Sequence, residues 1–307
     1  MLPLKTYITH PNIFASSLLQ HFFTWLPDEI YVKLLYRFRM GKRLNLKDPT
    51  TFQEKLQWLK LHDHNPLHTT LVDKIEVKDY VAKTIGSEYV IPLLGVWDKP
   101  EDIEWDKLPD RFVLKTNHSG GNTGVIICKD KRTFDKEGAI KKLNASLKSD
   151  IYRSLREWQY KNVHKRVFAE AYVETKLGAE DLPDYKFFCF NGEVKALFVA
   201  TDRQKEGEDV KFDYYDADYN HLPFKQGHEN AKVPPQKPVS FEEMKRLAAK
   251  LSKGIPHVRV DFYEVNERPI FGEFTFTHFA GMVPFEPEEW DYKFGEWLKL
   301  PEISNNK

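Results

Sequence analysis

The chain has 307 residues with 46 basic and 46 acidic side chains, so its formal net charge at pH 7 is zero. Hydrophobic residues make up 41% and charged residues 30%, a composition too apolar for a disordered chain and without the basic excess that favours a nucleic-acid partner. The two cysteines, Cys128 and Cys189, exclude a disulfide framework and a cysteine-ligated zinc site, and they favour a reducing, cytoplasmic setting.

Residues 1–88 are predicted to form a helical N-terminal region. The segment from Ile13 to Leu26 carries apolar side chains at helical spacing, and we expect a first core helix here. A helix lying on a membrane surface is the alternative. Polar residues interrupt the segment, and it is shorter than the ~20 apolar residues that a membrane span requires.

Further helices are expected in the same region. Residues 51–54 form a capping-box pattern that begins a helix, and another helix is predicted from Thr70 to Ile85, with Gly86 ending it. The segment 31–47 holds six basic residues and no acidic one. It is either a solvated helix face or a patch for an anionic polysaccharide or lipid head groups, which would give a peripheral membrane contact.

From residue 89 onward the pattern changes to short apolar runs bounded by turn residues, which is typical of strands. Strands are predicted over residues 89–97, 111–116, 124–128 and 166–174, and helices over residues 136–147 and 151–160. Asn191-Gly192 predicts a β-hairpin, and a second hairpin is predicted to turn near Asn266-Glu267. Helices followed by mixed elements with hairpins predict an α+β fold.

Lys115 ends a predicted strand directly before a glycine-rich loop, residues 118–124. Glycines let backbone N–H groups approach phosphate oxygens, and the lysine ammonium supplies a point charge. The pattern is not a P-loop, because the lysine precedes the glycines. Hairpin loops also use such residues, so this motif alone is a weak signal of phosphate binding.

Two carboxylates, Asp261 and Glu273, lie six residues on either side of the predicted turn near residue 267. Antiparallel pairing therefore places them side by side, where they repel each other unless a cation lies between them. Hard oxygen ligands at this spacing suit Mg²⁺ bound to substrate phosphates. Two solvated strand carboxylates are the alternative, but both residues lie in otherwise apolar strands.

In their order along the chain, these motifs resemble those of the ATP-grasp superfamily, and the chain is similar over nearly its whole length to the TupA-like ATP-grasp proteins of bacterial polysaccharide gene clusters. The resemblance rests on residues 44–60, 71–81, 89–98, 111–121, 156–162, 184–195, 258–263 and 272–276. It implies an ATP-grasp domain over residues 89–307, in which two α+β subdomains grip ATP. The lid subdomain would cover about 109–174 and the catalytic subdomain about 184–300.

The resemblance also implies roles for individual residues. Lys115 and Lys186 would bind the nucleotide phosphates, and Arg203 and Arg259 would contact the transferring phosphate or the acyl phosphate. The other implied ATP contacts are the loop residues His118, Ser119, Gly120 and Gly121, the strand and hinge residues Glu170, Ala171, Tyr172 and Val173 facing adenine, and Glu174 or Asp184 at the ribose.

Asp261 and Glu273 resemble the magnesium-binding pair of the superfamily. Thr275 stands at the position of the usual third ligand, which is an asparagine in the superfamily. The following segment, residues 277–281, also departs from the pattern expected there. We therefore expect the acceptor pocket to differ.

The resemblance implies an ATP- and Mg²⁺-dependent carboxylate–amine ligase that forms an amide through an acyl phosphate. Its setting suggests that an amino acid or amine is attached to a uronic acid in capsule, O-antigen or teichuronopeptide synthesis. A glycosyltransferase and a non-catalytic nucleotide- or polysaccharide-binding protein are the alternatives. The sequence lacks the paired Rossmann-like halves of many glycosyltransferases. A catalytically inactive site would have no physical need for both the lysines and the carboxylates, which argues against a non-catalytic protein.

Overall fold

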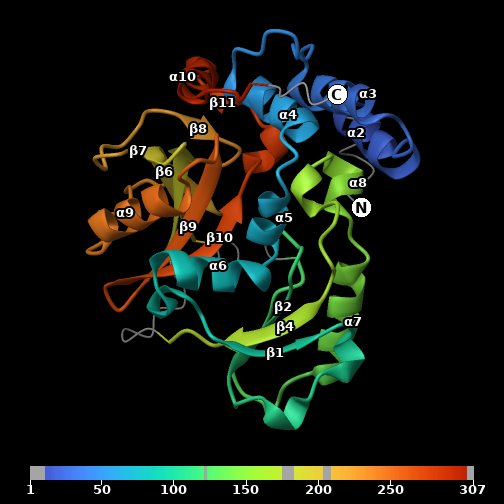
Figure 1. Ribbon diagram of the computed structural model, residues 1–307, viewed down its shortest axis with the longest axis vertical. Helices are drawn as coiled ribbons and strands as arrows, with labels where there is room; N and C mark the ends of the chain where they lie inside the picture. Colours follow the sequence, from blue (N-terminus) through green and yellow to red (C-terminus); the bar gives the residue numbers. More distant parts are fainter. Residues whose placement is uncertain (1–10, 121–122, 175–182, 203–208, 303–307) are drawn as a thin grey trace.

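The computed structural model describes residues 11–120, 123–174, 183–202 and 209–302. Within these residues two antiparallel β-sheets form the framework, one of five strands in the order β10-β9-β5-β6-β7 and one of four in the order β1-β4-β2-β3 (Figure 1). Helices lie on both sheets and between them. This mixed architecture confirms the α+β prediction.

The five-stranded sheet is built on the two predicted hairpins. Its strands are β5 (Asp184–Phe190), β6 (Glu193–Thr201), β7 (Lys211–Asp216), β9 (Val258–Val265) and β10 (Arg268–Thr275). The β5–β6 turn places Asn191 and Gly192 at φ 49° and 86°, and the β9–β10 turn places Asn266 and Glu267 at φ 52° and 65°. Positive φ at both central residues is the conformation that joins antiparallel strands by a two-residue loop. Both hairpin predictions are confirmed.

Helices cover both faces of this sheet. Because side chains alternate along a strand, Phe187 and Phe188 of β5 enter different cores. Phe187 packs with α9 (Phe241–Leu251) and α6 (Glu76–Ile85), and Phe188 packs with α4 (Phe52–His62) and α10 (Glu289–Trp297). The capping box predicted at residues 51–54 is confirmed at the start of α4. Two short strands that follow β7 along the chain, β8 (Lys225–Gln226) and β11 (Phe285–Glu286), pair with each other.

The four-stranded sheet has its own core beneath α7 (Lys136–Leu147). Its strands are β1 (Leu93–Trp97), β2 (Phe112–Thr116), β3 (Ile126–Cys128) and β4 (Val167–Ala171). β1 begins four residues later than the predicted strand 89–97. Pro92, which has no N–H to donate to a sheet, lies immediately before it. A short helix, α8 (Ile151–Leu155), connects α7 to the segment before β4.

The prediction of one continuous helix from Thr70 to Ile85 is wrong. The structure has α5 (Pro66–Val72) and α6, separated by three residues that begin with Asp73. The Asp73 Oδ1 atom accepts hydrogen bonds from the backbone N–H groups of Ile75, at 2.8 Å, and Glu76, at 3.3 Å. This local bonding competes with a continuous helix and starts a new one. The break places Lys74 outside both helices.

The helix predicted at Ile13 to Leu26 is present as far as Phe22, but the prediction that it is a core helix is wrong. The segment forms α2 (Pro11–Phe22), followed by a turn and α3 (Asp28–Met40). Leu19 of α2 is buried, whereas Phe22 is 65% and Trp25 is 74% exposed. Helical spacing identifies the apolar stripe but does not say whether it faces the protein. None of the helices in the described part of the chain combines the length and apolar character that a bilayer crossing requires.

Candidate functional site

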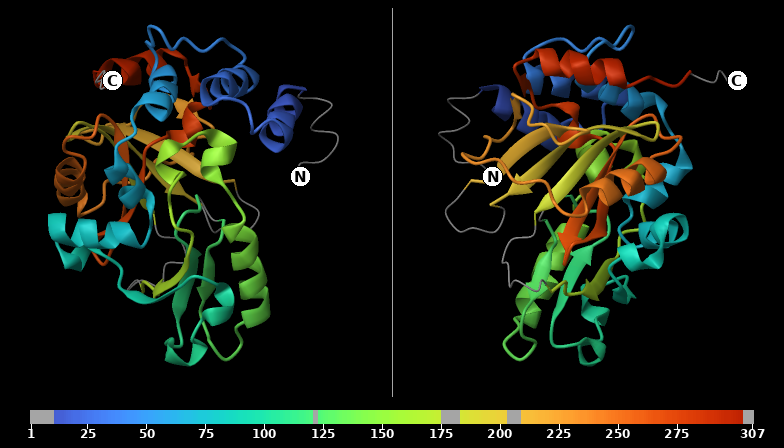
Figure 2. Two further views of the ribbon diagram at one scale, coloured as in Figure 1. Left: turned by 45° about the vertical axis from the view of Figure 1, so that its right-hand side comes forward. Right: turned by 90° about the vertical axis from the view of Figure 1, so that its left-hand side faces the viewer.

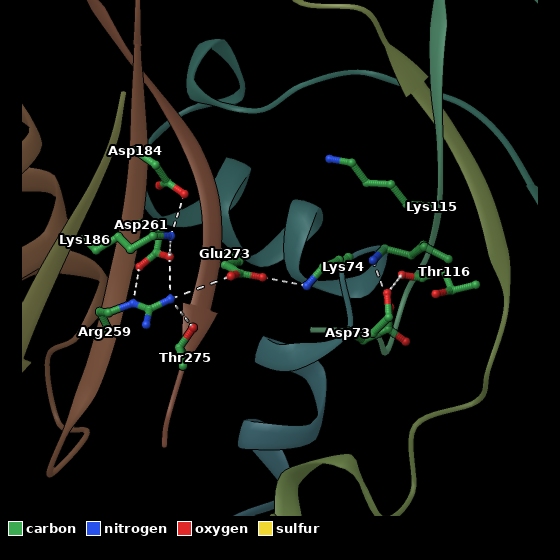
Figure 3. Close-up of polar contacts among 12 residues, drawn as sticks. Asp73, Lys74, Lys115, Thr116, Asp184, Lys186, Arg259, Asp261, Glu273 and Thr275 are labelled. Carbon is green, nitrogen blue, oxygen red and sulfur yellow. Dashed lines mark hydrogen bonds and ion pairs between the residues drawn. The ribbon is translucent and has the colours of Figure 1, made fainter. Parts of the chain in front are cut away.

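Charged side chains gather at one end of the five-stranded sheet, on the face that α4 and α10 cover elsewhere. Lys186 of β5 lies opposite Asp261 of β9. Between Phe271 and Phe274 the register of β10 shifts, so Gly272 and Glu273 together oppose Asp261. The predicted adjacency of Asp261 and Glu273 on neighbouring strands is therefore confirmed, and the bulge brings Glu273 onto the face that carries Asp261 and Lys186 (Figure 3).

Asp261 is almost fully buried and is held by two cations. Its Oδ1 and Oδ2 atoms accept hydrogen bonds of 2.7 Å each from Nε and Nη2 of Arg259. The Nζ atom of Lys186 lies 2.5 Å from Oδ2 of Asp261 and also 2.5 Å from Oδ2 of Asp184. Arg259 Nη2 donates a further hydrogen bond of 2.9 Å to Oγ1 of Thr275. Each buried charge thus has an opposite charge in contact, as burial requires.

Glu273 is more accessible, with 28% of its side chain exposed. Its Oε1 atom lies 3.7 Å from Arg259 Nη2, and its Oε2 atom lies 2.7 Å from Lys74 Nζ. Burial alone would raise the pKa of Glu273, but the charges of Lys74, Lys186 and Arg259 hold it well below its usual range. The carboxylate is therefore ionised at neutral pH and surrounded by positive charge.

Lys74 is a site residue that sequence reasoning missed, because the segment was predicted as a continuous helix. Its backbone N–H donates to the carbonyl oxygen of Asn117, the residue after β2, at 3.1 Å. The Nδ2 atom of Asn117 donates to Oδ2 of Asp73 at 2.8 Å. The junction between α5 and α6 is thereby bonded to the four-stranded sheet while Lys74 reaches the other sheet (Figure 3). The local signal was Asp73 itself, a helix-starting residue.

On the four-stranded sheet, Lys115 of β2 forms an ion pair with Glu170 of β4. Lys78 of α6, which sequence reasoning also missed, lies 3.1 Å from the other Glu170 oxygen. Burial would raise the pKa of Glu170, but Lys115 and Lys78 lower it. Figure 3 shows Lys115 across from the cluster of charged side chains on the five-stranded sheet. Lysines from the two sheets therefore border the same space.

We expect Glu170→Gln to destabilise the protein by roughly 1–3 kcal/mol at pH 7, because two lysines lose a buried anionic partner. The folded-state pKa of Glu170 is depressed, so its contribution is complete above the ordinary value of about 4.3 and is lost as the pH falls further. Thermal unfolding of both proteins between pH 7 and pH 3 checks this. The difference in melting temperature should shrink below pH 4, and a constant difference would contradict the assignment.

The predicted glycine-rich loop begins with two buried side chains. The Nε2 atom of His118 lies 3.2 Å from Ser149 Oγ, and burial, with Lys165 nearby, lowers the pKa of His118 to about 4. His118 is therefore neutral at pH 7. Ser119 Oγ donates to the carbonyl oxygen of Thr116 at 3.3 Å, and Gly120 is exposed. Gly121 lies outside the described residues.

Ala171, one of the predicted adenine contacts, is the last residue of β4. Its backbone N–H donates a hydrogen bond to the carbonyl oxygen of Pro92 at 3.0 Å. Val173 is partly exposed. The Arg111 guanidinium stacks on Tyr172, 4.5 Å from the ring centroid, and forms an ion pair with Glu174. Asp184, the alternative ribose contact, is buried beside Lys186 of the charged cluster. Arg203 lies outside the described residues.

The turn that follows β10, η5 (His278–Gly281), reaches the same cluster. His278 Nδ1 lies 2.8 Å from Nη1 of Arg259, and burial together with the Arg259 charge holds the pKa of His278 well below its usual range. Phe279 and Ala280 have φ of 51° and 56°. Lys60 of α4 donates to the carbonyl oxygen of Ala280 at 2.6 Å and helps to hold this strained backbone. Residues 277–281 were expected to depart from the family pattern, but the contact of His278 with Arg259 was not predicted.

The cluster offers oxygen ligands of the kind that Mg²⁺ prefers. In the described ranges there is no group of three or more His, Cys, Asp or Glu side chains placed to hold a metal ion. Two carboxylates, Asp261 and Glu273, are present, and Mg²⁺ is usually bound by one or two carboxylates together with substrate phosphates and water. The ionised, partly exposed Glu273 fits this role. Thr275 Oγ1 is a third oxygen nearby, bonded to Arg259.

A model of the TupA-like ATPgrasp family matches residues 54–299 of the chain. No curated protein sequence matches it. Among solved structures, the chain is similar to D-alanine–D-alanine ligase from Bacillus anthracis, with 16% identity and a TM-score of 0.38 over 67% of this chain and 57% of that chain. It is also similar to an L-amino acid ligase from Bacillus licheniformis, with 14% identity and a TM-score of 0.48 over 83% of this chain and 57% of that chain.

A third similar structure is N5-carboxyaminoimidazole synthase from Aspergillus clavatus, with 13% identity and a TM-score of 0.39 over 69% of this chain and 46% of that chain. The chain thus spans less than two thirds of the length of each of these three proteins. The family match extends over most of the chain and includes both sheets and the charged cluster. The resemblance inferred from the sequence is therefore confirmed, and the chain belongs to the TupA-like ATP-grasp family.

Proposed function

We propose that this protein is an ATP-dependent carboxylate–amine ligase that forms an amide and releases ADP and phosphate. The observation that carries the proposal is the cluster of Lys186, Arg259, Asp261 and Glu273 on one sheet, facing Lys115 on the other. Lysine and arginine side chains on both sheets can bind a polyanion such as a triphosphate, and the paired carboxylates provide for its divalent cation. Family membership supports ATP as the nucleotide.

We propose that β2, β3, β4 and α7, within residues 109–174, form the lid, with β1 of the preceding segment paired to its edge, and that the five-stranded sheet belongs to the catalytic subdomain, within residues 184–300. The lid would contribute Lys115 and the loop that begins at His118. In this arrangement the N-terminal region predicted over residues 1–88 also contributes to the site. Its α5–α6 junction supplies Lys74 to the space between the sheets, where the ammonium group can contact phosphate oxygens.

In the proposed reaction, a substrate carboxylate oxygen attacks the γ-phosphorus of ATP, and the bond between γ-phosphorus and the bridging oxygen breaks, giving an acyl phosphate and ADP. An amine then attacks the acyl carbon, loses a proton and expels inorganic phosphate. Lys186 and Arg259 would neutralise charge on the transferring phosphoryl group, and Lys115 and Lys74 would orient the phosphates. Mg²⁺, held by Asp261 and Glu273 with Thr275 nearby, would supply further charge neutralisation.

We propose that the strand and hinge Glu170–Val173 presents its backbone to adenine and that Glu174 binds the ribose. Glu174 is exposed, and among the described residues it pairs only with the exposed Arg111. Replacing this surface ion pair by a contact with ribose costs little free energy. Asp184 is buried against Lys186, which suits a structural role better. Arg203 stays a proposed phosphate contact on the strength of the family resemblance.

The family setting supports a uronic acid or an amino acid as the carboxylate substrate, with the amide product entering a capsule, O-antigen or teichuronopeptide. We place the reaction in the cytoplasm, where ATP is available, and at the inner face of the membrane when the acceptor is lipid-linked. The acyl phosphate must be shielded from water until the amine arrives. Closure of the lid against the five-stranded sheet would provide this shielding.

The reaction type is tested by labelling the carboxylate substrate with ¹⁸O and analysing the products by mass spectrometry. One labelled oxygen should appear in inorganic phosphate as the amide forms, and ADP should be the only nucleotide product. Candidate acids and amines are first screened in pairs for ADP release. Label retained entirely in the product, or release of AMP and pyrophosphate, would contradict the acyl-phosphate mechanism.

We expect Lys115→Ala to raise the apparent KM for ATP by about 10- to 100-fold, because a charged hydrogen bond to phosphate is worth ~1.5–3 kcal/mol. The value of kcat should change less, since the contact is made to bound ATP as well as to the transition state. Steady-state ADP release over a range of ATP concentrations measures both constants. Lys142→Ala, at an exposed lysine on α7, is the matched control. A loss confined to kcat would show that Lys115 acts only in the chemical step.

A further inference from the structure

Exposed apolar side chains are concentrated on α2 and on the turn that joins it to α3. Phe14, Leu18 and Phe22 follow one another at intervals of four residues, which aligns them along a single side of the helix. The exposed large apolar residues of this region are Ile13, Phe14, Leu18, Phe22, Phe23, Trp25 and Ile30. A contiguous apolar stripe of this kind on a protein surface marks an interaction site.

The other side of α2 is bound to the rest of the protein by hydrogen bonds. These contacts fix the rotation of the helix and keep the apolar stripe on the outside. Gln20 donates to the carbonyl oxygen of Ser154 in α8 at 3.1 Å and accepts a hydrogen bond from Arg39 of α3 at 3.3 Å. Leu19 is buried against the core of α3. Ser16, Leu19 and Gln20 therefore face the protein while Leu18 and Phe22 face outward, so the side of α2 turned to the protein is not its most apolar side.

Basic residues border this apolar surface. On α3, Ile30, Lys33 and Arg37 share one side of the helix by their spacing of three and four residues. Arg37, Arg43 and Lys47 are exposed, and none of them forms an ion pair with another residue of the described ranges. A depression between α3 and residues 44–47 is lined by Glu29, Leu44, Asn45, Leu46, Lys33, Lys47 and His62. The surface therefore combines aromatic side chains with unneutralised positive charge.

We propose that α2, the α2–α3 turn and the basic side of α3 form a docking surface for an anionic lipid membrane. Tryptophan and phenylalanine side chains insert at the boundary between head groups and acyl chains, and Lys and Arg bind acidic head groups. A protein partner would explain the aromatic stripe equally well, but the adjacent positive charge favours an anionic surface. The surface lies away from the four-stranded sheet, so docking leaves the space between the sheets open (Figures 1 and 2).

The test is flotation of the full-length protein with vesicles of phosphatidylcholine alone or with 30% phosphatidylglycerol added. We expect at least tenfold stronger binding to the anionic vesicles, weakening as salt is raised. A double variant, Phe22→Ser with Trp25→Ser, should bind at least tenfold more weakly. Arg43→Gln with Lys47→Gln should lose the preference for phosphatidylglycerol. The matched control is Val233→Ser with Val239→Ser, whose side chains are 82% and 74% exposed elsewhere on the surface.

Nucleotide binding should be unchanged in all of these variants, because none of the substituted residues belongs to the charged cluster between the sheets. The docking test therefore stands or falls independently of the proposed ligase reaction. Failure of the wild-type protein to bind anionic vesicles would overturn the inference. So would equal weakening by the valine control, or a concentration-dependent dimer in gel filtration that the Phe22 and Trp25 substitutions abolish, since the stripe would then contact a second copy of the chain.

Discussion

Glu273→Gln is expected to lower ATP turnover by two to three orders of magnitude at saturating substrates. The substitution keeps the size of the side chain but removes the accessible anion of the proposed magnesium pair. Charge stabilisation by a metal ion is worth several kcal/mol in the transition state, and each ~1.4 kcal/mol corresponds to a factor of ten in rate. The residual activity should require much more Mg²⁺ than the wild type does. ADP release measured over a range of Mg²⁺ concentrations gives both results.

Two variants separate this role from a structural one. Glu264→Gln is the matched control, because Glu264 lies in the same hairpin and accepts hydrogen bonds from Ser240, at 2.7 Å from N and 2.6 Å from Oγ. It should leave turnover and Mg²⁺ dependence unchanged. Asp261→Asn should also lower turnover, but it leaves Lys186 and Arg259 partly unpaired and lowers stability as well. Near-normal activity of Glu273→Gln at low Mg²⁺ would rule out the metal assignment.

The pairing of these strands could be predicted from the chain because it follows from local chemistry. Two-residue turns at Asn191 and Asn266 fix the register of each hairpin, and counting outward from the second turn brings Asp261 opposite Gly272, directly beside Glu273. The bulge at Gly272 and Glu273 was not predicted. It shifts the register by one residue and brings Glu273 onto the face of Lys186, which simple alternation from the turn would not have done.

The residues that sequence reasoning missed are brought to the site by tertiary contacts. Lys74 and Lys78 come from a region predicted to precede the nucleotide-binding domain, and the contacts with Glu273 and Glu170 join positions 199 and 92 residues apart. No local pattern encodes such a contact. His278 was hidden for a similar reason, because its role depends on the position of Arg259 across the sheet.

The outward face of α2 shows a different limit of sequence patterns. An apolar stripe at helical spacing identifies an amphipathic helix, but the free energy of burial is satisfied by a membrane or a partner as well as by the protein core. Here the inner side is fixed by Gln20 and Leu19, a polar residue and a single apolar one. The structure was needed to show which side of the helix contacts the protein.

Arg259 connects the elements of the cluster, and its removal is expected to have the largest effect on both stability and turnover. Its guanidinium binds both oxygens of Asp261 and contacts Thr275 and His278, while Glu273 lies 3.7 Å away. Burial would lower the pKa of Arg259, but the neighbouring carboxylates raise it, so the group is always charged. A planar cation with several donors at the carboxylate pair can hold the acids in place and also meet a phosphoryl group.

Arg259→Met should therefore destabilise the fold by roughly 3–5 kcal/mol, the usual cost of breaking a buried ion pair. It should also reduce turnover by at least a thousandfold, while the Kd for a non-hydrolysable ATP analogue rises less than in Lys115→Ala. Arg259→Lys keeps the charge but not the forked geometry, so it should recover much of the stability and little of the turnover. Thermal unfolding, calorimetric titration with the analogue and ADP release measure the three quantities. If Arg259→Lys turned over ATP at a near wild-type rate, charge alone would be sufficient, and the two-point contact with Asp261 would have only a structural role.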